Sequence, residues 1–476
     1  MAIKFVLLML GALLSACAPL ALKPGFDEVQ SLVATRLPQA LAWHQSKAER
    51  DTHQPAMSAM IEAPLTLDSA LRLALIGNPN LQADYEKLGI AYGDLAQAGL
   101  PANPTLSFSV RSSAVGIGRE IGVVQDILSL LALAPRKRIA TALFDETKLH
   151  TAQRVVSLAA EVKKAYFDAY AAQEIFNMER EATAAAAVAA ELAQRQSDAG
   201  NIGTRELALR QEFHARAVLR QSRQELTREE TRERLNRIMG LPSSQRQWSF
   251  ATIQPNAVDD IPELKLLEEK ALKDRFDIAA SSKHVARLAD ALGVANRFRY
   301  LSALGVGVGF ARETDGEKLR GPSVTIGLPL WDRNQGARFR MQSELRESER
   351  QLDGAVLDAL GDVRSAYARL TNAQQALQHF RTTLLPLHER IVAETLKFYN
   401  GMLLGVYHLL SAKQNQLDAQ RDHVEMVKMH RLATVDLEHA IGGGTIGKTI
   451  EVQKTLPAAE PEAKPDIHKH HSKDMP

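Results

Sequence analysis

The sequence predicts a mainly α-helical chain with a small membrane β-barrel, in which long coiled-coil hairpins and four β-strands form a duplicated repeat. Three observations support this prediction. The two halves of the chain match each other at a spacing of 201 residues. Each half holds a very long stretch almost free of proline and glycine. Ahead of each stretch lie short segments that alternate apolar and polar residues, which is the strand period.

The composition favours long helices over a compact globular core. The chain has 476 residues, of which 45% are hydrophobic but only 5% aromatic, and Ala, Leu, Glu, Arg and Gln dominate long stretches. The net charge of +2 and the lack of a basic stripe interleaved with aromatics argue against nucleic-acid binding. The single cysteine excludes an internal disulfide and a zinc site built from several thiolates.

The N-terminus has the layout of a signal peptide over residues 1–16. Lys4 precedes an apolar run, and small residues lead to Cys17. The run Leu14-Ser15-Ala16-Cys17 resembles the lipobox of bacterial lipoproteins, which implies a covalent lipid such as palmitate on Cys17. In the lipoproteins that it resembles, Asp after the cysteine retains the protein at the inner membrane, so Ala18 points to the outer membrane.

A transmembrane helix over residues 5–22 is the alternative to this signal peptide, but Pro19 and the small residues before Cys17 count against it. The lipid tethers the protein and opens no path through a membrane. No later run of about 18 apolar residues exists, so any crossing of the membrane must use strands.

The duplication is clearest in the two long stretches. Ala165-Tyr166 and Ala172-Gln173 match Ala366-Tyr367 and Ala373-Gln374. Around them an apolar stripe with steps of four and three residues predicts helices wound on one another. In the first half it comprises Val155, Ala159, Val162, Tyr166, Ala169, Gln173 and Phe176, and in the second Val356, Leu360, Val363, Tyr367, Leu370, Gln374 and Leu377.

The long helices are expected at residues 136–199 and 337–399. Each would span roughly 95 Å at ~1.5 Å per residue. Gly354 and Gly361 are weak points of the second helix, and Pro386 predicts a kink in it. Helices at 67–99 and 262–297 are expected to begin the repeats, and helices at 204–239 and 406–441 to return from the long ones.

Each long helix is expected to end in a turn that reverses the chain. Gly200-Asn201 and Asn400-Gly401 supply the residues that tolerate the left-handed conformation of a helix C-cap. Thr204 is expected to cap the first returning helix.

Strands are expected at residues 105–110, 120–127, 303–310 and 323–330. Their alternation suits a barrel wall with lipid on one side and water on the other. Four strands cannot close a barrel, and open edges are not tolerated in lipid. Three chains would pool twelve strands, so a homotrimer is expected.

These elements divide the chain into a lipid-anchored extension (17–64), a first repeat (65–242), a linker (243–261), a second repeat (262–443) and a His-rich tail predicted to be disordered (444–476). Together, the lipobox, the doubled helix–strand pair–long helix–helix unit and the two turns resemble the TolC-like outer-membrane efflux proteins, particularly their lipoprotein branch. The resemblance covers about residues 17–443.

The resemblance implies a homotrimer with a twelve-stranded barrel in the outer membrane of a Gram-negative bacterium and a helical tunnel reaching into the periplasm. It also implies that substrates arrive from an inner-membrane pump through a periplasmic adaptor protein and leave passively, without a cofactor. Two other hypotheses remain: an exit duct for type I protein secretion, and a structural envelope lipoprotein without a pore.

In the family that it resembles, the turns contact the adaptor, although glycines that only cap helices are an alternative. The matching residues are Gly200, Ile202, Gly203, Thr204, Gly401, Leu404 and Gly405. Relatives often narrow the closed end with acidic or bulky residues, but residues 399–417 contain no Asp or Glu. The gate is therefore predicted as a Tyr407–His408 constriction or an Asp198–Arg205 latch.

No motif predicts catalysis. The glycines of residues 305–309 lack the dinucleotide-binding spacing, and Val392 stands where the zincin pattern begun by His388-Glu389 needs a second histidine. The tail carries His468, His470 and His471, which suggest transient copper or zinc contact; a solvated tail without a role, or an expression tag, is the alternative. The tail favours heavy-metal ions, such as copper, over drugs as the substrate.

Overall fold

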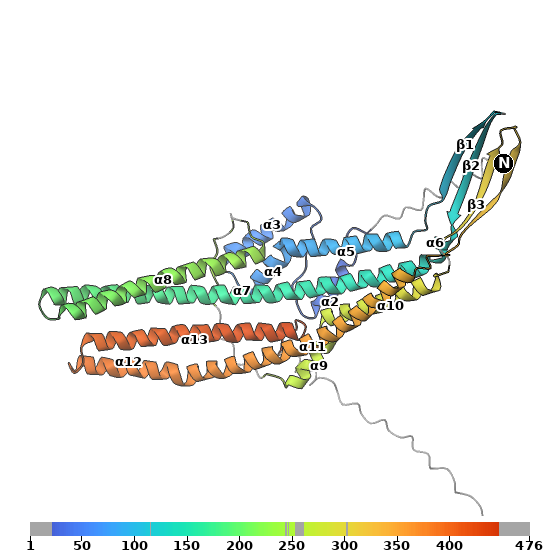
Figure 1. Ribbon diagram of the computed structural model, residues 1–476. Helices are drawn as coiled ribbons and strands as arrows, with labels where there is room; N and C mark the ends of the chain where they lie inside the picture. The colour runs from blue at the N-terminus through green and yellow to red at the C-terminus, as the bar shows by residue number, and fades with distance from the viewer. Residues whose placement is uncertain are drawn as a thin grey trace, which may run out of the picture.

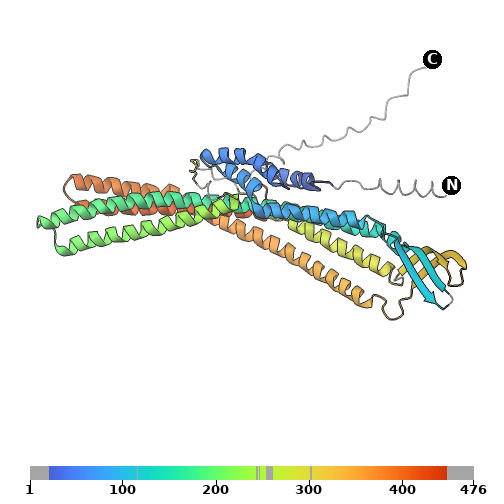
Figure 2. The ribbon, with the colours of Figure 1, turned by 90° about the horizontal axis from the view of Figure 1, so that it is seen from above.

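The computed structural model describes residues 21–114, 116–242, 245, 247–252, 261–300 and 303–446. The predicted signal peptide, Cys17 and the tail histidines His468, His470 and His471 lie outside these residues. The molecule is elongated, with a β-sheet at one end and the turns of two helical hairpins at the other (Figures 1 and 2).

The same order of elements occurs twice, which agrees with the predicted mainly helical fold with four strands. Two helices come first, α2 (Phe26–Ala34) and α3 (Lys47–Glu62). Then follow α4 (Leu67–Gly77), α5 (Pro79–Ala98), β1 (Thr105–Ser113), β2 (Gly116–Asp126), α6 (Ile127–Leu131), α7 (Leu133–Asp198) and α8 (Thr204–Met239). The second series is α9 (Leu264–Asp274), α10 (Phe276–Arg297), β3 (Ala303–Arg312), β4 (Lys318–Gly327), α11 (Gln335–His379), η2 (Phe380–Leu384), α12 (Leu385–Asn400) and α13 (Val406–Ala440).

The first helix of each repeat is broken in two, where we expected one continuous helix. At the first break, Asn78 Oδ1 accepts a hydrogen bond from Leu81 N at 3.0 Å and caps α5, and Pro79 occupies its first turn. Proline lacks the N–H that would continue α4. At the second break Arg275 is extended, and its guanidinium contacts Asp277 at 2.6 Å and Asp362 at 3.1 Å.

Helix α7 is the central rod of the molecule. Its 66 residues correspond to about 100 Å at ~1.5 Å per residue. The predicted stripe is largely buried: Val155, Ala159, Val162, Tyr166, Ala169 and Phe176 lie in the interior. The Tyr166 hydroxyl donates a hydrogen bond to Leu65 O at 3.0 Å, which satisfies the polar end of a buried ring.

The second long rod contains one extra residue. A π-helical turn, η2, interrupts it and ends two residues before Pro386, where a kink was predicted. Tyr166 and Tyr367 stand 201 positions apart, whereas the N-caps Gly203 and Gly405 stand 202 apart. A π-turn widens an α-helix locally by one residue, so η2 accounts for this insertion. It also accommodates a proline that cannot donate the next helical hydrogen bond.

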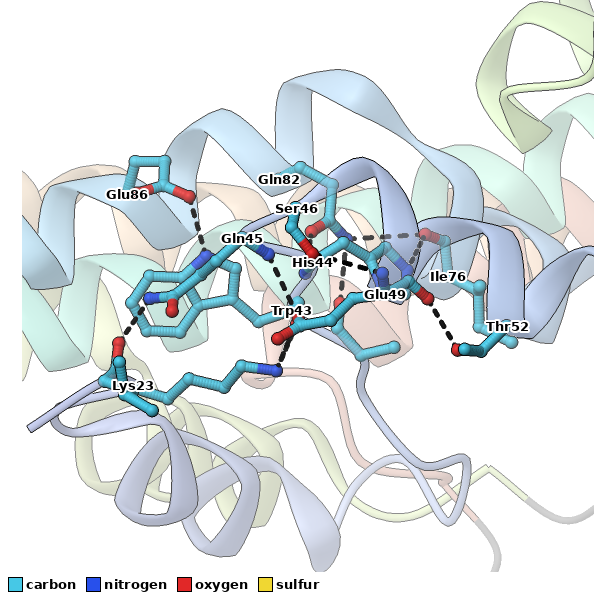
Figure 3. A network of polar contacts seen from close by, with 12 residues as sticks. Lys23, Trp43, His44, Gln45, Ser46, Glu49, Thr52, Ile76, Gln82 and Glu86 are labelled. Carbon is cyan, nitrogen blue, oxygen red and sulfur yellow. Dashed lines mark hydrogen bonds and ion pairs between the residues drawn. The ribbon is translucent and has the colours of Figure 1, made fainter.

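The segment that precedes the first repeat packs on α5 through aromatic and polar contacts (Figure 3). Phe26 meets the buried Tyr85 edge-on, with ring centroids 5.2 Å apart. Trp43 Nε1 donates to Glu86 Oε1 at 2.9 Å. Lys23 Nζ reaches Trp43 O at 2.7 Å and Glu49 Oε2 at 3.0 Å. These contacts fix the chain close to the predicted lipid anchor against the helical body.

The four strands form one antiparallel sheet in the order β1-β2-β3-β4. Residues paired across antiparallel strands share a face, so the register defines two different faces. One face is apolar and exposed, and it holds Leu106, Phe108, Val110, Ile121, Val123, Val306, Val308, Phe310, Val324 and Ile326. The other face carries mostly small or polar residues, among them Ser107, Ser109, Glu120, Gly122, Gly305, Gly307, Gly309, Ser323 and Thr325.

Among the described residues, no helix has the length and apolar character needed to cross a membrane.

A buried carboxylate joins the two repeats. Glu146 of α7 lies 2.9 Å from Arg287 Nε and 2.9 Å from His284 Nδ1, both on α10, and His150 is 3.8 Å away. Burial raises the pKa of Glu146, but contacts with His150, Arg287 and His284 outweigh this effect and lower it to about 2. The ionised carboxylate therefore stabilises the packing of α7 on α10.

Replacing Glu146 with Gln should lower the free energy of unfolding by about 3 kcal/mol at neutral pH, because Arg287 loses its buried partner. The folded-state pKa is depressed, so this contribution is present above the ordinary pKa of glutamate and is lost as the pH falls toward about 2. Denaturant midpoints measured across pH test this. The exposed Glu181→Gln on the same helix is the control, and a pH-independent difference for Glu146→Gln would contradict the prediction.

Candidate functional site at the hairpin tips

The turn between α7 and α8 closes with the hydrogen bonds of a Schellman motif. Gly200 N donates to Ser197 O at 2.9 Å, and Asn201 N donates to Gln196 O at 2.8 Å. Gly200 has a φ of +75°, which a residue without Cβ adopts at little cost. The predicted left-handed cap is confirmed at this tip.

The turn between α12 and α13 has the same hydrogen bonds but a different residue at the left-handed position. Met402 N donates to Tyr399 O at 3.0 Å, and Leu403 N donates to Phe398 O at 2.9 Å. Met402 has a φ of +55°, whereas Gly401 has a φ of −78°. The expectation that Asn400 or Gly401 takes the left-handed conformation is therefore wrong, because the extra residue of η2 moves the turn by one position.

Thr204 does not cap the returning helix as expected. It is the first residue of α8, and Gly203 occupies the N-cap without a side-chain hydrogen bond. Gly405 is the corresponding N-cap of α13. Two apolar side chains that the sequence reasoning missed project from the second tip: Met402 is 95% exposed and Leu403 72% exposed. Two adjacent large apolar residues in a turn were the available signal.

Tyr407 joins the two hairpins close to their tips. Its hydroxyl donates a hydrogen bond to Gln196 Oε1 on α7 at 2.6 Å. The guanidinium of Arg210 on α8 lies over the Tyr407 ring at 4.1 Å from the centroid, and Arg210 Nε also donates to Glu206 at 3.1 Å. A single residue of α13 thus contacts both helices of the first hairpin.

The other predicted gate residues are not brought together. Asp198 accepts a hydrogen bond from Gln194 at 2.8 Å, and the described residues show no ion pair between Asp198 and Arg205. His408 is exposed beside Tyr407, and its backbone N–H donates to Gly405 O at 3.1 Å.

A groove of about 390 Å³ runs between the hairpins next to Tyr407. Alanines of α7 line it together with leucines and a phenylalanine of α8 and α13. The lining includes Ala182, Ala185, Ala186, Ala189, Leu209, Phe213, Leu410 and Leu417, with Arg210, Glu212, Arg216 and Lys413 among the polar residues. Small side chains on one helix let the neighbouring helices approach without filling the space between them.

A buried carboxylate lies beyond the groove, farther from the tips. Glu179 of α7 contacts Arg220 of α8 at 3.3 Å and Arg421 of α13 at 3.4 Å. Burial lowers the pKa of Arg421, but Asp418, Asp422 and Glu179 outweigh this effect and raise it. The sequence reasoning missed this contact, although a charged residue three positions after Phe176 of the apolar stripe was a signal.

The described residues contain no group of three or more His, Cys, Asp or Glu side chains that could hold a metal ion. The rings of His44 and His53 lie close together, with centroids 4.7 Å apart and planes tilted by 54°. Burial is the main cause of the lowered pKa of His44, and the neighbouring His53 adds to it.

Comparisons with known proteins fit this architecture. No profile of a known protein family matches the chain. The cobalt-zinc-cadmium resistance protein CzcC of Cupriavidus metallidurans is 26% identical over 400 residues, covering 82% of this chain and 92% of its own. A membrane protein from Pseudomonas aeruginosa matches with a TM-score of 0.68 at 15% identity, covering 86% of this chain and 96% of its own. The CmeC outer membrane channel of Campylobacter jejuni matches with a TM-score of 0.65 at 17% identity, covering 88% of this chain and 95% of its own.

The chain has the TolC-like fold of outer-membrane channels. The resemblance proposed from the lipobox, the duplication and the turns is thereby confirmed at the level of the fold. Within this TolC-like fold, the hairpin tips lie at the end of the molecule opposite the sheet (Figure 1). Of the predicted gate residues, Tyr407 is the one that contacts the hairpin of α7 and α8 from α13.

Replacing Tyr407 with Phe should loosen the contact between the hairpins, because the ring remains but Gln196 loses its hydrogen-bond donor. A net hydrogen bond contributes about 1 kcal/mol, so the population of separated tips should rise roughly fivefold. Open probability in planar bilayers measures this. Tyr399→Phe is the matched control, because its hydroxyl makes no hydrogen bond among the described residues. Equal open probabilities for Tyr407→Phe and the parent would remove Tyr407 from the gate.

Proposed function

We propose that the protein is the outer-membrane exit duct of a tripartite efflux system. It conducts substrates passively, without catalysis and without a cofactor, from an inner-membrane pump and a periplasmic adaptor to the outside. The observation that supports this most directly is the sheet, which has one exposed apolar face and one small, polar face at the end of two long hairpins.

The sheet is suited to a membrane only as part of an assembly. The apolar face would contact lipid, and the small, polar face would line a water-filled lumen. Strands β1 and β4 are the edges of the sheet, and their outer backbone groups need partners in lipid. Three chains would join these edges into a twelve-stranded barrel, so the functional unit is a homotrimer.

The hairpins provide the periplasmic part of the duct. A helix of about 100 Å reaches far from the membrane, and three chains place six hairpin tips around one opening. The adaptor contacts these tips at Gly200, Ile202, Gly203, Thr204, Gly401, Leu404 and Gly405, and the exposed Met402 and Leu403 add apolar surface to that contact.

The gate lies where the hairpins meet. Tyr407 holds α13 against α7 and α8, and His408 narrows the same level. Separation of the hairpins breaks the Tyr407 contacts. The adaptor opens the tip only if it binds the separated state more tightly than the closed one.

Heavy-metal ions are the favoured substrate class. The support is similarity to a relative named for cobalt, zinc and cadmium resistance, together with the tail histidines His468, His470 and His471, which could contact copper or zinc transiently. Drugs are the alternative cargo. A lipid on Cys17 would tether the chain to the outer membrane, close to where residues 21–62 pack on the helical body.

A lysine on the apolar face should prevent assembly, whereas the same residue one position away should not. Phe108→Lys places a charge against lipid, which costs about 2–4 kcal/mol near the bilayer midplane. Ser107→Lys places it on the lumen face, where water solvates it. Trimer content on semi-native gels and conductance in planar bilayers measure the difference. Equal loss of trimer in both variants would contradict the assignment of the two faces.

The decisive test of the proposed function is conductance of the purified trimer combined with metal accumulation in cells. A strain without the protein should retain more copper, zinc, cobalt or cadmium than the parent strain. Restoring the parent sequence, but not Phe108→Lys, should reverse this. A trimer that conducts no ions would indicate a structural lipoprotein. Normal metal efflux together with loss of a secreted protein would indicate a secretion duct.

A further inference from the structure

A cluster of positive charge lies on the apolar face of the sheet, at the end farthest from the helices. In the antiparallel register, Arg119 of β2 pairs with Arg312 of β3, and Arg312 pairs with Lys318 of β4. Arg320 lies two residues farther along β4, opposite Phe310. We call these four residues the cationic rim. All four are exposed.

The cationic rim lacks compensating charge within the chain. Like charges placed directly opposite each other across strands destabilise a sheet, and here three cations lie side by side. Among the described residues none of the four makes an ion pair, and the carboxylates of the adjoining turn, Glu313, Asp315 and Glu317, do not approach them closely enough to pair. An external anion would therefore relieve repulsion that the sheet itself leaves in place.

The position of the cationic rim along the sheet indicates which kind of anion would bind to it. Along β3, Leu304 and Arg312 share the apolar face and are eight residues apart, which corresponds to about 26 Å at ~3.3 Å per residue. The apolar band of membrane barrels is about 25 Å tall. Barrel strands tilt by about 35–45°, so this length rises about 20 Å along the membrane normal. The cationic rim therefore lies close to the outer end of the hydrocarbon region, near the lipid headgroups.

The proposed orientation places this end at the outer leaflet, because the helices extend from the opposite end into the periplasm. Lipopolysaccharide occupies the outer leaflet of Gram-negative outer membranes, and its lipid A bears phosphates at the top of the acyl chains. Arg guanidinium groups bind phosphate oxygens in paired hydrogen bonds. The chemistry, height and face of the cationic rim therefore match this lipid.

We infer that Arg119, Arg312, Lys318 and Arg320 form a binding site for the lipid A phosphates of lipopolysaccharide. Three copies of the site would surround the trimer. The acyl chains would cover the apolar residues below the cationic rim, such as Val123 and Val308, while the phosphates neutralise the three cations in register. This inference rests on the proposed function for the orientation of the sheet.

The test measures binding of fluorescent bisphosphoryl lipid A to the full-length trimer in detergent. The variant carrying Arg119→Gln, Arg312→Gln, Lys318→Gln and Arg320→Gln should lose at least about tenfold in affinity, because one charge-assisted hydrogen bond alone accounts for roughly that factor. The single variant Arg312→Gln should weaken binding severalfold. Added salt should weaken binding to the parent and have little effect on the fourfold variant.

The matched control is Arg111→Gln. Arg111 lies on the other face of the sheet, where it pairs with Glu120 at 3.0 Å, so its loss should leave lipid A affinity unchanged. Single-channel conductance of each variant is recorded in parallel. Because the rim residues do not line the lumen, conductance should remain normal in the fourfold variant.

Either of two lipid A measurements would overturn the inference: equal lipid A affinity for the fourfold variant and the parent, or equal affinity of the parent for lipid A with and without phosphates. Equal binding of phosphatidylglycerol would also overturn it, because the site would then be a general anion surface. A parent trimer that conducts nothing would instead count against the proposed function. The two failures are therefore distinguishable.

Discussion

The sheet imposes the constraint on which the rest of the structure depends. Four strands have two open edges, and one face of the sheet exposes a continuous set of large apolar side chains. Neither feature is stable in water for a lone chain, and open edges are not stable in lipid either. Association of identical chains resolves both problems, and it brings the helical hairpins of each chain around one axis. The proposed duct and its lipid-facing rim follow from this one requirement.

Duplication alone does not make the two hairpins equivalent. The π-turn η2 adds one residue to the second rod, so the second tip takes its left-handed conformation at Met402, where the first uses Gly200. The result is one compact tip and one tip with exposed apolar side chains. A partner that contacts both tips would therefore meet two different surfaces, although the repeats share their order of elements.

Polar contacts between the hairpins are arranged by distance from the tips. Tyr407 contacts α7 and α8 close to the turns, Glu179 joins α7, α8 and α13 farther away, and Lys163 pairs with Glu438 at 2.7 Å farther still. The contact at the tip involves one neutral hydrogen bond and a cation over a ring, whereas the inner contacts are ion pairs. Partial separation at the tips thus costs less than separation along the whole length, which suits a gate at the end of a rigid tube.

Local sequence determined the secondary structure, the duplication and the positions of the turns, because apolar periodicity, glycine and proline act within a few residues. The break at Asn78 had a local signal, Asn78 followed by Pro79, which was missed. The break at Arg275 depends in part on Asp362, a partner distant in the chain. The sequence reasoning also missed the contact of Tyr407 with Gln196 and the alignment of Arg119, Arg312 and Lys318 across β2, β3 and β4. Those neighbours come from different repeats, or from different strands of the same repeat, and only tertiary packing fixes the register that brings them together.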